Sequence, residues 1–348
     1  MSNQWKINKY RRRVMQKLTE NVGAKHRLTK MQIKEKAEIK NILLIRPNHR
    51  LGNLLMLTPL LQEIETVFPA AKVNVFIKGT IGPVLFKEYT SVDKIVQLPR
   101  KPFKQLGLYI KQLFFLKKEK YDLVINADKN SSSGKIFTQL TRATYKIFGT
   151  IEDEKLSLDS AFVHMATSPV FCLRQLLKQS GIETSATFPA LNLKLTPDEI
   201  ELGKKQWESV ADTSKPTLCI FTFATGTKCY SKSWWDVFYR RLLQEFPAYQ
   251  IVEVLPVENV SQIEFKAPSF YSKDVREIAA FFYHTEIFIG ADSGMMHLAA
   301  ASGIPTVGLF SKTNSAKYKP YGNRSMAIDT NTTSQDDWIT NIKRILES

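Results

Sequence analysis

The chain has 348 residues, of which 43% are hydrophobic and 24% charged, and this length and composition are typical of a folded protein with about two domains. Its 49 lysines and arginines against 33 acidic residues give a net charge of +16, which favours anionic partners such as phosphates, acidic lipids or nucleic acids. The three cysteines are odd in number and none stand at C-x-x-C spacing, so we expect neither a disulfide framework nor a zinc site.

Residues 1–40 are predicted to form a basic leader or arm. They contain twelve lysines and arginines and three glutamates, so +9 of the net charge of +16 lies in this segment. It lacks the apolar run and cleavage site of a secretory signal, and no apolar stretch of the chain is long enough to predict a membrane-spanning helix. The sequence leaves open whether the leader is a solvated arm or a tether to an anionic membrane or nucleic acid.

Residues 41–190 are predicted to form an N-terminal α/β domain. Helical segments separate the apolar runs, and this alternation is typical of a parallel sheet covered by helices. Residues 103–120 predict a basic amphipathic helix, which either packs on the core or lies against an anionic membrane. Strands are predicted at residues 41–46, 73–77, 94–98 and 122–126.

A second α/β series is predicted in residues 191–348, after a polar and irregular stretch around residues 180–195. Together the two series predict two doubly wound domains that face a cleft. Strands are expected at residues 217–222, 250–255, 286–290 and 306–310, and helices at residues 232–246 and after Asp274, Gly294 and Asp336.

Three loops that follow predicted strands hold the candidate site residues, because ligands bind beyond the carboxyl ends of the strands in open α/β sheets. The first loop runs from Arg46 to Asn53 and contains His49, Arg50 and Gly52. Its glycine permits a tight turn, and the helix that follows can receive an anion at its N-terminus.

The second loop, residues 290–297, brings a carboxylate, a hydroxyl and a glycine to the start of a helix rich in small residues. Asp292 or Ser293 could act only as a helix N-cap. Alternatively, the amides of this helix start bind a diphosphate while Asp292 accepts hydrogen bonds from sugar hydroxyls. The third loop, residues 222–233, contains Lys228 and Lys232, which are either surface lysines or ligands of an anion, because lysine near a helix start opposes the helix dipole.

The three loops together resemble the glycosyltransferase family 9 enzymes, which include the lipopolysaccharide heptosyltransferases. The segment NILLIRPNHRLGNLLMLTPLL is similar to the family's N-terminal block, Lys232-Ser-Trp234 to its Lys-x-Trp block, and FIGADSGMMHLAAASGIPTVGLF to its Asp-Thr/Ser-Gly-x-x-His block. The resemblance covers about residues 41 to 325. It implies a GT-B architecture, with the acceptor in the N-terminal Rossmann-like domain and the sugar nucleotide mainly in the C-terminal one.

The resemblance also implies the reaction and its partners. The reaction is an inverting transfer of a sugar from a nucleotide-activated donor, which is ADP-heptose in the heptosyltransferases. The acceptor is a lipid-linked or polysaccharide molecule of the cell envelope. The reaction is expected to need no metal ion or other cofactor. Such an enzyme would be cytoplasmic and peripheral on the inner face of the cytoplasmic membrane, which residues 1–40 and 103–120 could contact. Nucleic acid is not expected as a partner, because the charge is concentrated in the leader and no recognition module is evident.

Roles for the individual residues follow from the same resemblance. The amides of Ser293, Gly294 and Met295 would hold the donor diphosphate, and Lys232 would neutralise the leaving group. Asp292 would orient the hydroxyls of the transferred sugar, and His297 would support the loop or the phosphate. The first loop, with Arg46, Arg50 and Gly52, would face the acceptor.

The chain departs from the family pattern at one position. The aspartate taken as the general base of the family is Asn53 here, and an amide cannot accept the proton of the acceptor hydroxyl. We expect another group to replace it, and prefer Asp128, at the end of a predicted strand, over His49. Two alternatives stay open: the acceptor is a stronger nucleophile, or the protein is a catalytically silent sugar-nucleotide or glycan-binding protein.

Overall fold

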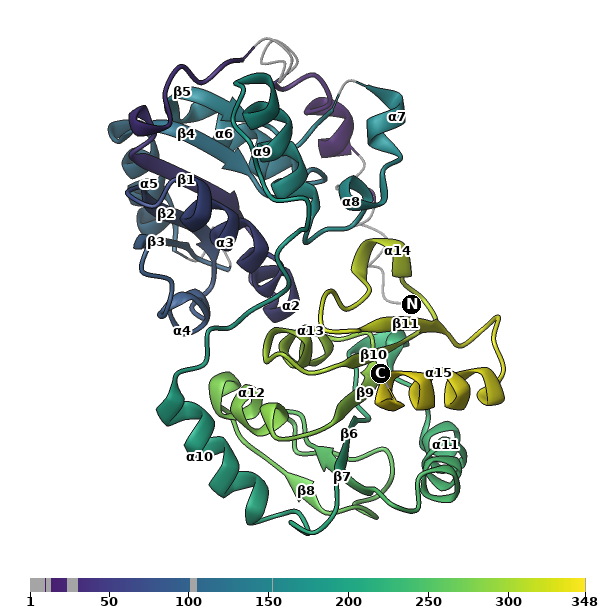
Figure 1. Cartoon of the computed structure of the whole chain (residues 1–348). Coiled ribbons are helices and arrows are strands. Elements are labelled where there is room, and N and C mark those ends of the chain that lie inside the picture. The colour runs from purple at the N-terminus through teal and green to yellow at the C-terminus, as the bar shows by residue number, and fades with distance from the viewer. Residues whose placement is uncertain (1–9, 11–13, 24–30, 101–104, 152, 348) are drawn as a thin grey trace. The chain divides into compact units, whose positions relative to one another are not determined.

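The computed structural model of the chain describes residue 10 and residues 14–23, 31–100, 105–151 and 153–347 (Figure 1). The chain divides into two compact units. The first comprises residues 1–49, 59–83 and 89–188, and the second comprises residues 50–58, 84–88 and 189–348. The main division between the units therefore falls after Phe188, whereas the sequence predicts it after residue 190. Two short segments of the N-terminal half belong to the second unit.

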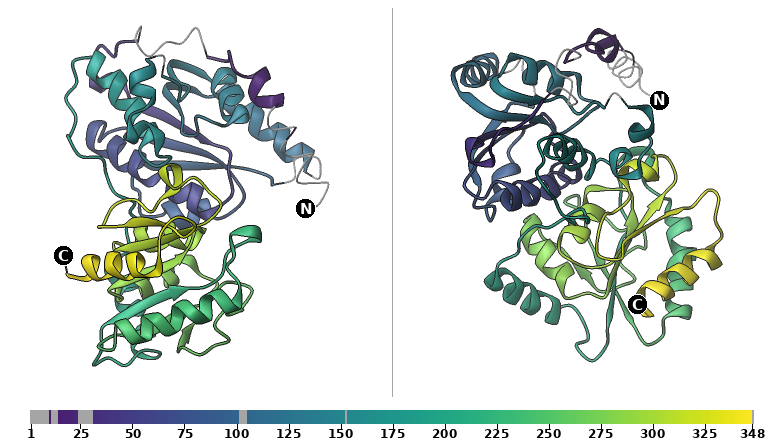
Figure 2. Two further views of the ribbon diagram at one scale, coloured as in Figure 1. Left: turned by 90° about the vertical axis from the view of Figure 1, so that its right-hand side faces the viewer. Right: turned by 45° about the horizontal axis from the view of Figure 1, so that its top comes forward.

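The sheet of the first unit has the strand order β3-β2-β1-β4-β5, and all of its neighbouring strands are parallel. Helices α3 and α9 cover one face and α5 and α6 the other (Figures 1 and 2). Because both faces are covered, the central strands read as continuous apolar runs, and Ile42 to Ile45 of β1 are fully buried. The strands are β1 (Asn41–Arg46), β2 (Lys72–Lys78), β3 (Val92–Leu98), β4 (Lys120–Asn126) and β5 (Arg142–Ile147).

A buried ion pair joins the two helices on one face of this sheet. Arg174 of α9 donates from Nε and Nη2 to both carboxylate oxygens of Glu63 of α3, each over 2.7 Å. The helices that follow this unit's strands are α3 (Thr58–Val67), α4 (Gly82–Phe86), α5 (Leu106–Lys118), α6 (Ser132–Leu140), α7 (Glu154–Ser157), α8 (Ser160–Val163) and α9 (Ser168–Gln179), with a short 3-10 turn η2 (Lys36–Glu38) before β1.

The second unit repeats this architecture with the strand order β11-β10-β9-β6-β7-β8, again with parallel neighbours. Helices α10, α12 and α13 lie on one face and α11 and α15 on the other (Figure 1). On the latter face Trp235 and Phe238 of α11 pack with Trp338 and Ile342 of α15 into the core. The strands are β6 (Thr217–Phe221), β7 (Gln250–Val254), β8 (Ser269–Phe270), β9 (Ile287–Ala291), β10 (Thr306–Phe310) and β11 (Met326–Asp329).

One short helix from the N-terminal half of the sequence lies wholly in the second unit. This is α2 (Leu51–Leu55), which packs against α13. The other helices of the unit are α10 (Pro197–Glu208), α11 (Lys232–Glu245), α12 (Val275–Tyr283), α13 (Gly294–Ala301), α14 (Ser315–Tyr318) and α15 (Gln335–Glu347), and a 3-10 turn η4 (Gly226–Lys228) follows β6.

The two predicted parallel sheets are confirmed, and each predicted strand lies within two residues of an observed one. The sequence did not predict β5, β8 and β11, which are edge strands of the two sheets. It also did not predict the helices α4, α6, α7, α8, α9, α10 and α14. In the described part of the chain no helix is both long and apolar enough to cross a membrane.

Candidate functional site

The order of strands in the second unit reverses between β6 and β9, so the loops that follow these two strands diverge from neighbouring positions. The strands are in register to their ends, where Phe221 pairs with Gly290. From the loop after β6, Lys228 donates from Nζ to Oδ2 of Asp292, in the loop after β9, over 2.9 Å. Two of the three loops singled out in the sequence therefore meet at this switch point.

Asp292 is held in one orientation from three sides. Its side chain is 8% exposed, and its Oδ2 accepts hydrogen bonds from Lys228 and from the hydroxyl of Thr313, in the loop after β10. Its backbone N–H donates to the carbonyl oxygen of Leu309 over 3.0 Å. The carboxylate is thus preorganised to accept further hydrogen bonds at the edge of the sheet.

The N-terminus of α13 lies directly after Asp292. The first amides of an α-helix have no acceptor within the helix, and Ser293 at the N-cap does not bond to them through its side chain. Instead, Ser293 Oγ is buried without a hydrogen-bond partner among the described residues. The helix dipole, the uncapped amides and this hydroxyl together form an arrangement that binds an anion such as a phosphate.

Helix α2 packs closely on α13 through two glycines. A Cβ at Gly52 would lie 2.5 Å from Cδ2 of the buried His297, and a Cβ at Gly294 would lie 3.1 Å from Cβ of Leu51. Asn53, the next residue of α2, is half-buried. The structure thus brings the first and last sequence blocks together within the second unit, and it places His297 beneath Gly52.

Lys232 takes another position. It begins α11, and its Nζ lies 3.0 Å from Oε1 of Glu264, with 62% and 60% of the two side chains exposed. Ser231 caps the same helix by accepting a hydrogen bond from Trp234 N–H. The lysine that reaches Asp292 is therefore Lys228. The sequence identified it only as one of two lysines in the third loop that could bind an anion.

The loop carrying Lys228 is anchored by a buried carboxyl group. Glu253, at the end of β7, accepts hydrogen bonds from Thr222 Oγ1 over 2.5 Å and from Ser261 Oγ over 2.6 Å. Burial raises the pKa of Glu253, and the two hydroxyl donors act in the opposite direction. Because Thr222 directly follows β6, this carboxyl group fixes the point from which the Lys228 loop departs.

In the first unit the strand order reverses between β1 and β4. Arg46 at the end of β1 is fully buried and donates to the carbonyl oxygen of Ala127, so it ties β1 to the loop after β4. His49 is exposed in the loop after β1. Asp128 follows β4, and its Oδ1 accepts a hydrogen bond from Asn130 N–H over 3.1 Å. His49 and Asp128 therefore both lie in loops at this switch point, whereas the exposed Arg50 precedes α2 in the second unit.

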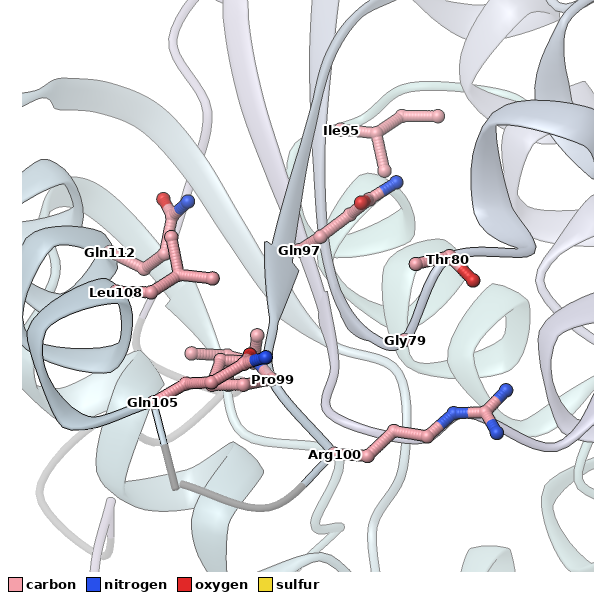
Figure 3. Close-up of a pocket in the computed structure, with 10 residues that line it drawn as sticks. Gly79, Thr80, Ile95, Gln97, Pro99, Arg100, Gln105, Leu108 and Gln112 are labelled. Carbon is pink, nitrogen blue, oxygen red and sulfur yellow. The ribbon is translucent and has the colours of Figure 1, made fainter. Parts of the chain in front are cut away.

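A cavity of about 560 Å³ lies beyond the carboxyl ends of β2 and β3 (Figure 3). Beside it, Lys78 N–H at the end of β2 donates to the carbonyl oxygen of Asn48 in the His49 loop, and within its lining Gly79 N–H donates to the carbonyl oxygen of Leu98. A Cβ at Gly79 would meet Arg100 Nε at 3.0 Å and His49 Cβ at 3.2 Å, so Arg100 and His49 flank the same glycine.

The lining of this cavity combines amide side chains with apolar walls. Gln97 lies on β3, and Gln112 and Leu108 project from α5 (Figure 3). An amide both donates and accepts hydrogen bonds, which suits hydroxyl groups, and the Arg100 guanidinium suits a carboxylate or phosphate. The sequence does not predict this cavity, because its lining residues form no local motif. They are Gly79, Thr80, Ile95, Gln97, Leu98, Pro99, Arg100, Gln105, Leu108 and Gln112.

Comparisons with known proteins identify a family and a relative that this chain resembles. Residues 272–341 match the model of the family described as glycosyltransferase family 9 (heptosyltransferase). Lipopolysaccharide heptosyltransferase 3 of Escherichia coli is 21% identical over 297 residues, which cover 78% of this chain and 84% of that protein.

Two solved structures share the fold. A family 9 glycosyltransferase from Veillonella parvula superposes with a TM-score of 0.67 at 17% identity, over 90% of this chain and 99% of that one. The ADP-heptose lipopolysaccharide heptosyltransferase II of E. coli gives a TM-score of 0.62 at 14% identity, over 89% and 99%. The comparisons confirm the predicted resemblance to glycosyltransferase family 9 and the GT-B fold, and they support a glycosyltransferase activity.

Proposed function

We propose that the protein transfers a sugar, heptose or a similar one, from a nucleotide-diphosphate donor to a lipid-linked or polysaccharide acceptor in lipopolysaccharide synthesis. The transfer is inverting and independent of metal ions. The observation that carries this proposal is the junction of Lys228, Asp292 and the uncapped N-terminus of α13 at the switch point of the second unit. One of the structural relatives is an ADP-heptose lipopolysaccharide heptosyltransferase, which supports ADP-heptose as the donor.

The donor half of the reaction follows from these groups. The amides of Gly294 and Met295 and the hydroxyl of Ser293 bind the diphosphate, and the positive end of α13 stabilises the charge that develops as the nucleoside diphosphate leaves. Asp292 accepts hydrogen bonds from the sugar hydroxyls and so fixes the orientation of the anomeric carbon. In this proposal the helix and a lysine provide the positive charge that a metal ion provides in other transferases.

The acceptor half involves the first unit. The cavity beside the His49 loop offers amide groups for hydroxyls and Arg100 for an acidic substituent, which supports a saccharide as the acceptor. We propose Asp128 as the base that takes the proton of the attacking hydroxyl. Asn53 in place of the family aspartate is the one observation that favours the second candidate function, a catalytically silent sugar-nucleotide-binding protein.

Calorimetric titration of the full chain with ADP, GDP, UDP and CDP, with and without EDTA, tests the proposed function. We expect one nucleotide to bind selectively, with micromolar to millimolar affinity as is common for enzyme substrates, and equally well in EDTA. Adenosine is the control for ADP, because it lacks the diphosphate. Binding only in the presence of a divalent cation would correct the metal independence, and binding of no nucleotide would contradict the proposal.

We further propose that the protein is cytoplasmic and associates peripherally with the inner face of the membrane through α5. This helix exposes Leu106, Ile110 and Phe114 by 53%, 42% and 68%, and its last turn carries Lys117 and Lys118. Exposed apolar and basic side chains on one helix are typical of interfacial binding to anionic lipid. Residues 103 and 104 of the predicted segment, and 1–9, 11–13 and 24–30 of the leader, lie outside the described residues.

Replacing Phe114 by serine should weaken binding to vesicles of phosphatidylcholine with 30% phosphatidylglycerol by at least about 10-fold, because burying a phenylalanine contributes about 1.5–3 kcal/mol. Cosedimentation of the protein with the vesicles measures this. The control is Val237→Ser, which removes a side chain of 50% exposure from α11 in the second unit and should leave binding unchanged. Equal binding of both variants and the parent would exclude α5 as the contact.

A further inference from the structure

We propose that Lys228 is the cation that binds the donor diphosphate and that its ion pair with Asp292 makes the site selective for nucleotide sugars over free diphosphates. This inference rests on the proposed function. Without donor, Lys228 is held by Asp292; with donor, it turns towards the phosphates while the sugar hydroxyls take its place on the carboxylate. Thr313 is a positioning residue that keeps Asp292 in orientation during this exchange.

The contacts of the two lysines distinguish them. Lys228 Nζ lies 2.9 Å from Asp292 Oδ2 and 3.3 Å from the Asp292 carbonyl oxygen, one residue before the N-cap of α13. Lys232 lies against Glu264 on the surface, with 62% and 60% of the two side chains exposed. A cation beside the uncapped amides of α13 can contact the same phosphates as those amides, so Lys228 is the lysine placed for the leaving group.

The surroundings of Lys228 allow it to move. It ends the short turn η4, whose first residue, Gly226, has a φ of +67° and no atom within 4 Å of the position of a Cβ. The lysine side chain is 31% exposed, whereas that of Asp292 is 8% exposed. The lysine is therefore the mobile partner of the pair. Its ammonium carries three donors, so it can bind more than one phosphate oxygen once it turns away from Asp292.

The exchange has a consequence for specificity. A diphosphate alone brings negative charge close to the buried carboxylate of Asp292. It has to weaken the ion pair between Lys228 and Asp292, and it offers the carboxylate no hydrogen-bond donor in return. A nucleotide sugar compensates for that loss, because its hydroxyls donate to the carboxylate that the lysine has left. Asp292 thus disfavours free diphosphate and favours donor, which also promotes release of the nucleoside diphosphate after transfer.

Calorimetric titration of the full chain with pyrophosphate, with the nucleoside diphosphate that it prefers, and with the glucose conjugate of that nucleotide tests the inference. Lys228→Met should weaken binding of all three probes by at least about 10-fold, since hydrogen bonds to charged groups are among the strong ones. The matched control Lys232→Met should change each by less than about 2-fold. Asp292→Asn should strengthen pyrophosphate binding and weaken binding of the nucleotide sugar, a change in opposite directions that general damage to the fold does not produce.

Further variants separate folding from binding. Lys228→Met leaves Asp292 without its cation, so Lys228→Arg, which keeps the charge, should retain most of the affinity and serves as the folding control. Thr313→Val should lower the preference for the nucleotide sugar over pyrophosphate, and Thr313→Ser should restore it. If Lys232→Met has the larger effect, or if Asp292→Asn weakens all three probes equally, the inference is wrong while nucleotide binding by the parent still upholds the proposed function. If the parent binds no nucleotide, both the inference and the proposed function are contradicted.

Discussion

Replacing Asp128 by asparagine is expected to lower kcat by about 10²–10⁴-fold, the usual contribution of a general base, while nucleotide binding stays unchanged. Asp128 follows β4 at the switch point of the first unit, where strand ends direct side chains towards ligands. Its Oδ1 accepts a hydrogen bond from Asn130 N–H, and its carboxylate accepts no other bond from the described residues. Oδ2 therefore has capacity to accept the proton of an acceptor hydroxyl.

The measurement is the rate of donor consumption with a lipopolysaccharide acceptor, at saturating nucleotide sugar, for the parent and three variants. Asp128→Asn keeps an oxygen in place for the Asn130 bond, so its loss of rate reports on proton transfer and not on the turn. His49→Gln should reduce kcat by less than Asp128→Asn. Asn53→Asp should leave the rate of an active enzyme nearly unchanged, whereas a gain of activity from a silent parent would show that the aspartate of the first block is the missing base. An unchanged rate in Asp128→Asn would remove Asp128 from the mechanism.

The sequence predicted the parts of this protein in which local pattern and burial agree. Strands such as β1 and β9 are covered on both faces, so their sequences are continuous apolar runs, and α11 and α15 show the helical spacing that packs Trp235 and Trp338 into one core. The two-residue strand β8 and the edge strand β5, whose residues 142–146 are mostly polar, have no such pattern. Their positions follow from pairing with β7 and β4.

The candidate site was predictable where a motif is contiguous. Residues 292–297 could be assigned to a helix start because a carboxylate, a hydroxyl residue and a glycine follow an apolar run. Pairings across the fold could not be assigned, since Lys228 and Asp292 are 64 positions apart and Lys228 and Lys232 look alike in sequence. The cavity of the first unit was missed for the same reason, because Thr80, Gln97 and Gln112 meet only once the strands and α5 are packed.

Replacing Arg276 by methionine is expected to destabilise the protein by about 3–5 kcal/mol at pH 7, the usual cost of removing one partner from a buried ion pair. Arg276, 4% exposed on α12, donates to both carboxylate oxygens of Glu199 over 2.6 and 2.7 Å. It also donates to the carbonyl oxygens of Val84, Leu193 and Lys194, so the methionine removes this donor from the carboxylate and from three carbonyl oxygens. Urea denaturation measures the effect. Arg240→Met is the control, because its pair with Asp236 is exposed and should contribute less than about 1 kcal/mol.

The pH dependence separates this ion pair from simple loss of packing. Burial alone would raise the pKa of Glu199, but hydrogen bonds from Arg276, Lys87 and Thr196 N–H outweigh it and hold the pKa at about 2. Because this folded-state pKa lies below the usual value of 4.5, the pair's contribution is fully present above pH 4.5 and is lost as the pH falls towards 2. At 1.36 kcal/mol for each pKa unit this lowering corresponds to about 3 kcal/mol, and because Glu199 is 18% exposed, solvent screening makes the contribution of the pair smaller than this. The difference in stability between the parent and Arg276→Met should therefore shrink between pH 4.5 and pH 2, whereas a difference that is constant over this range would assign the effect to packing.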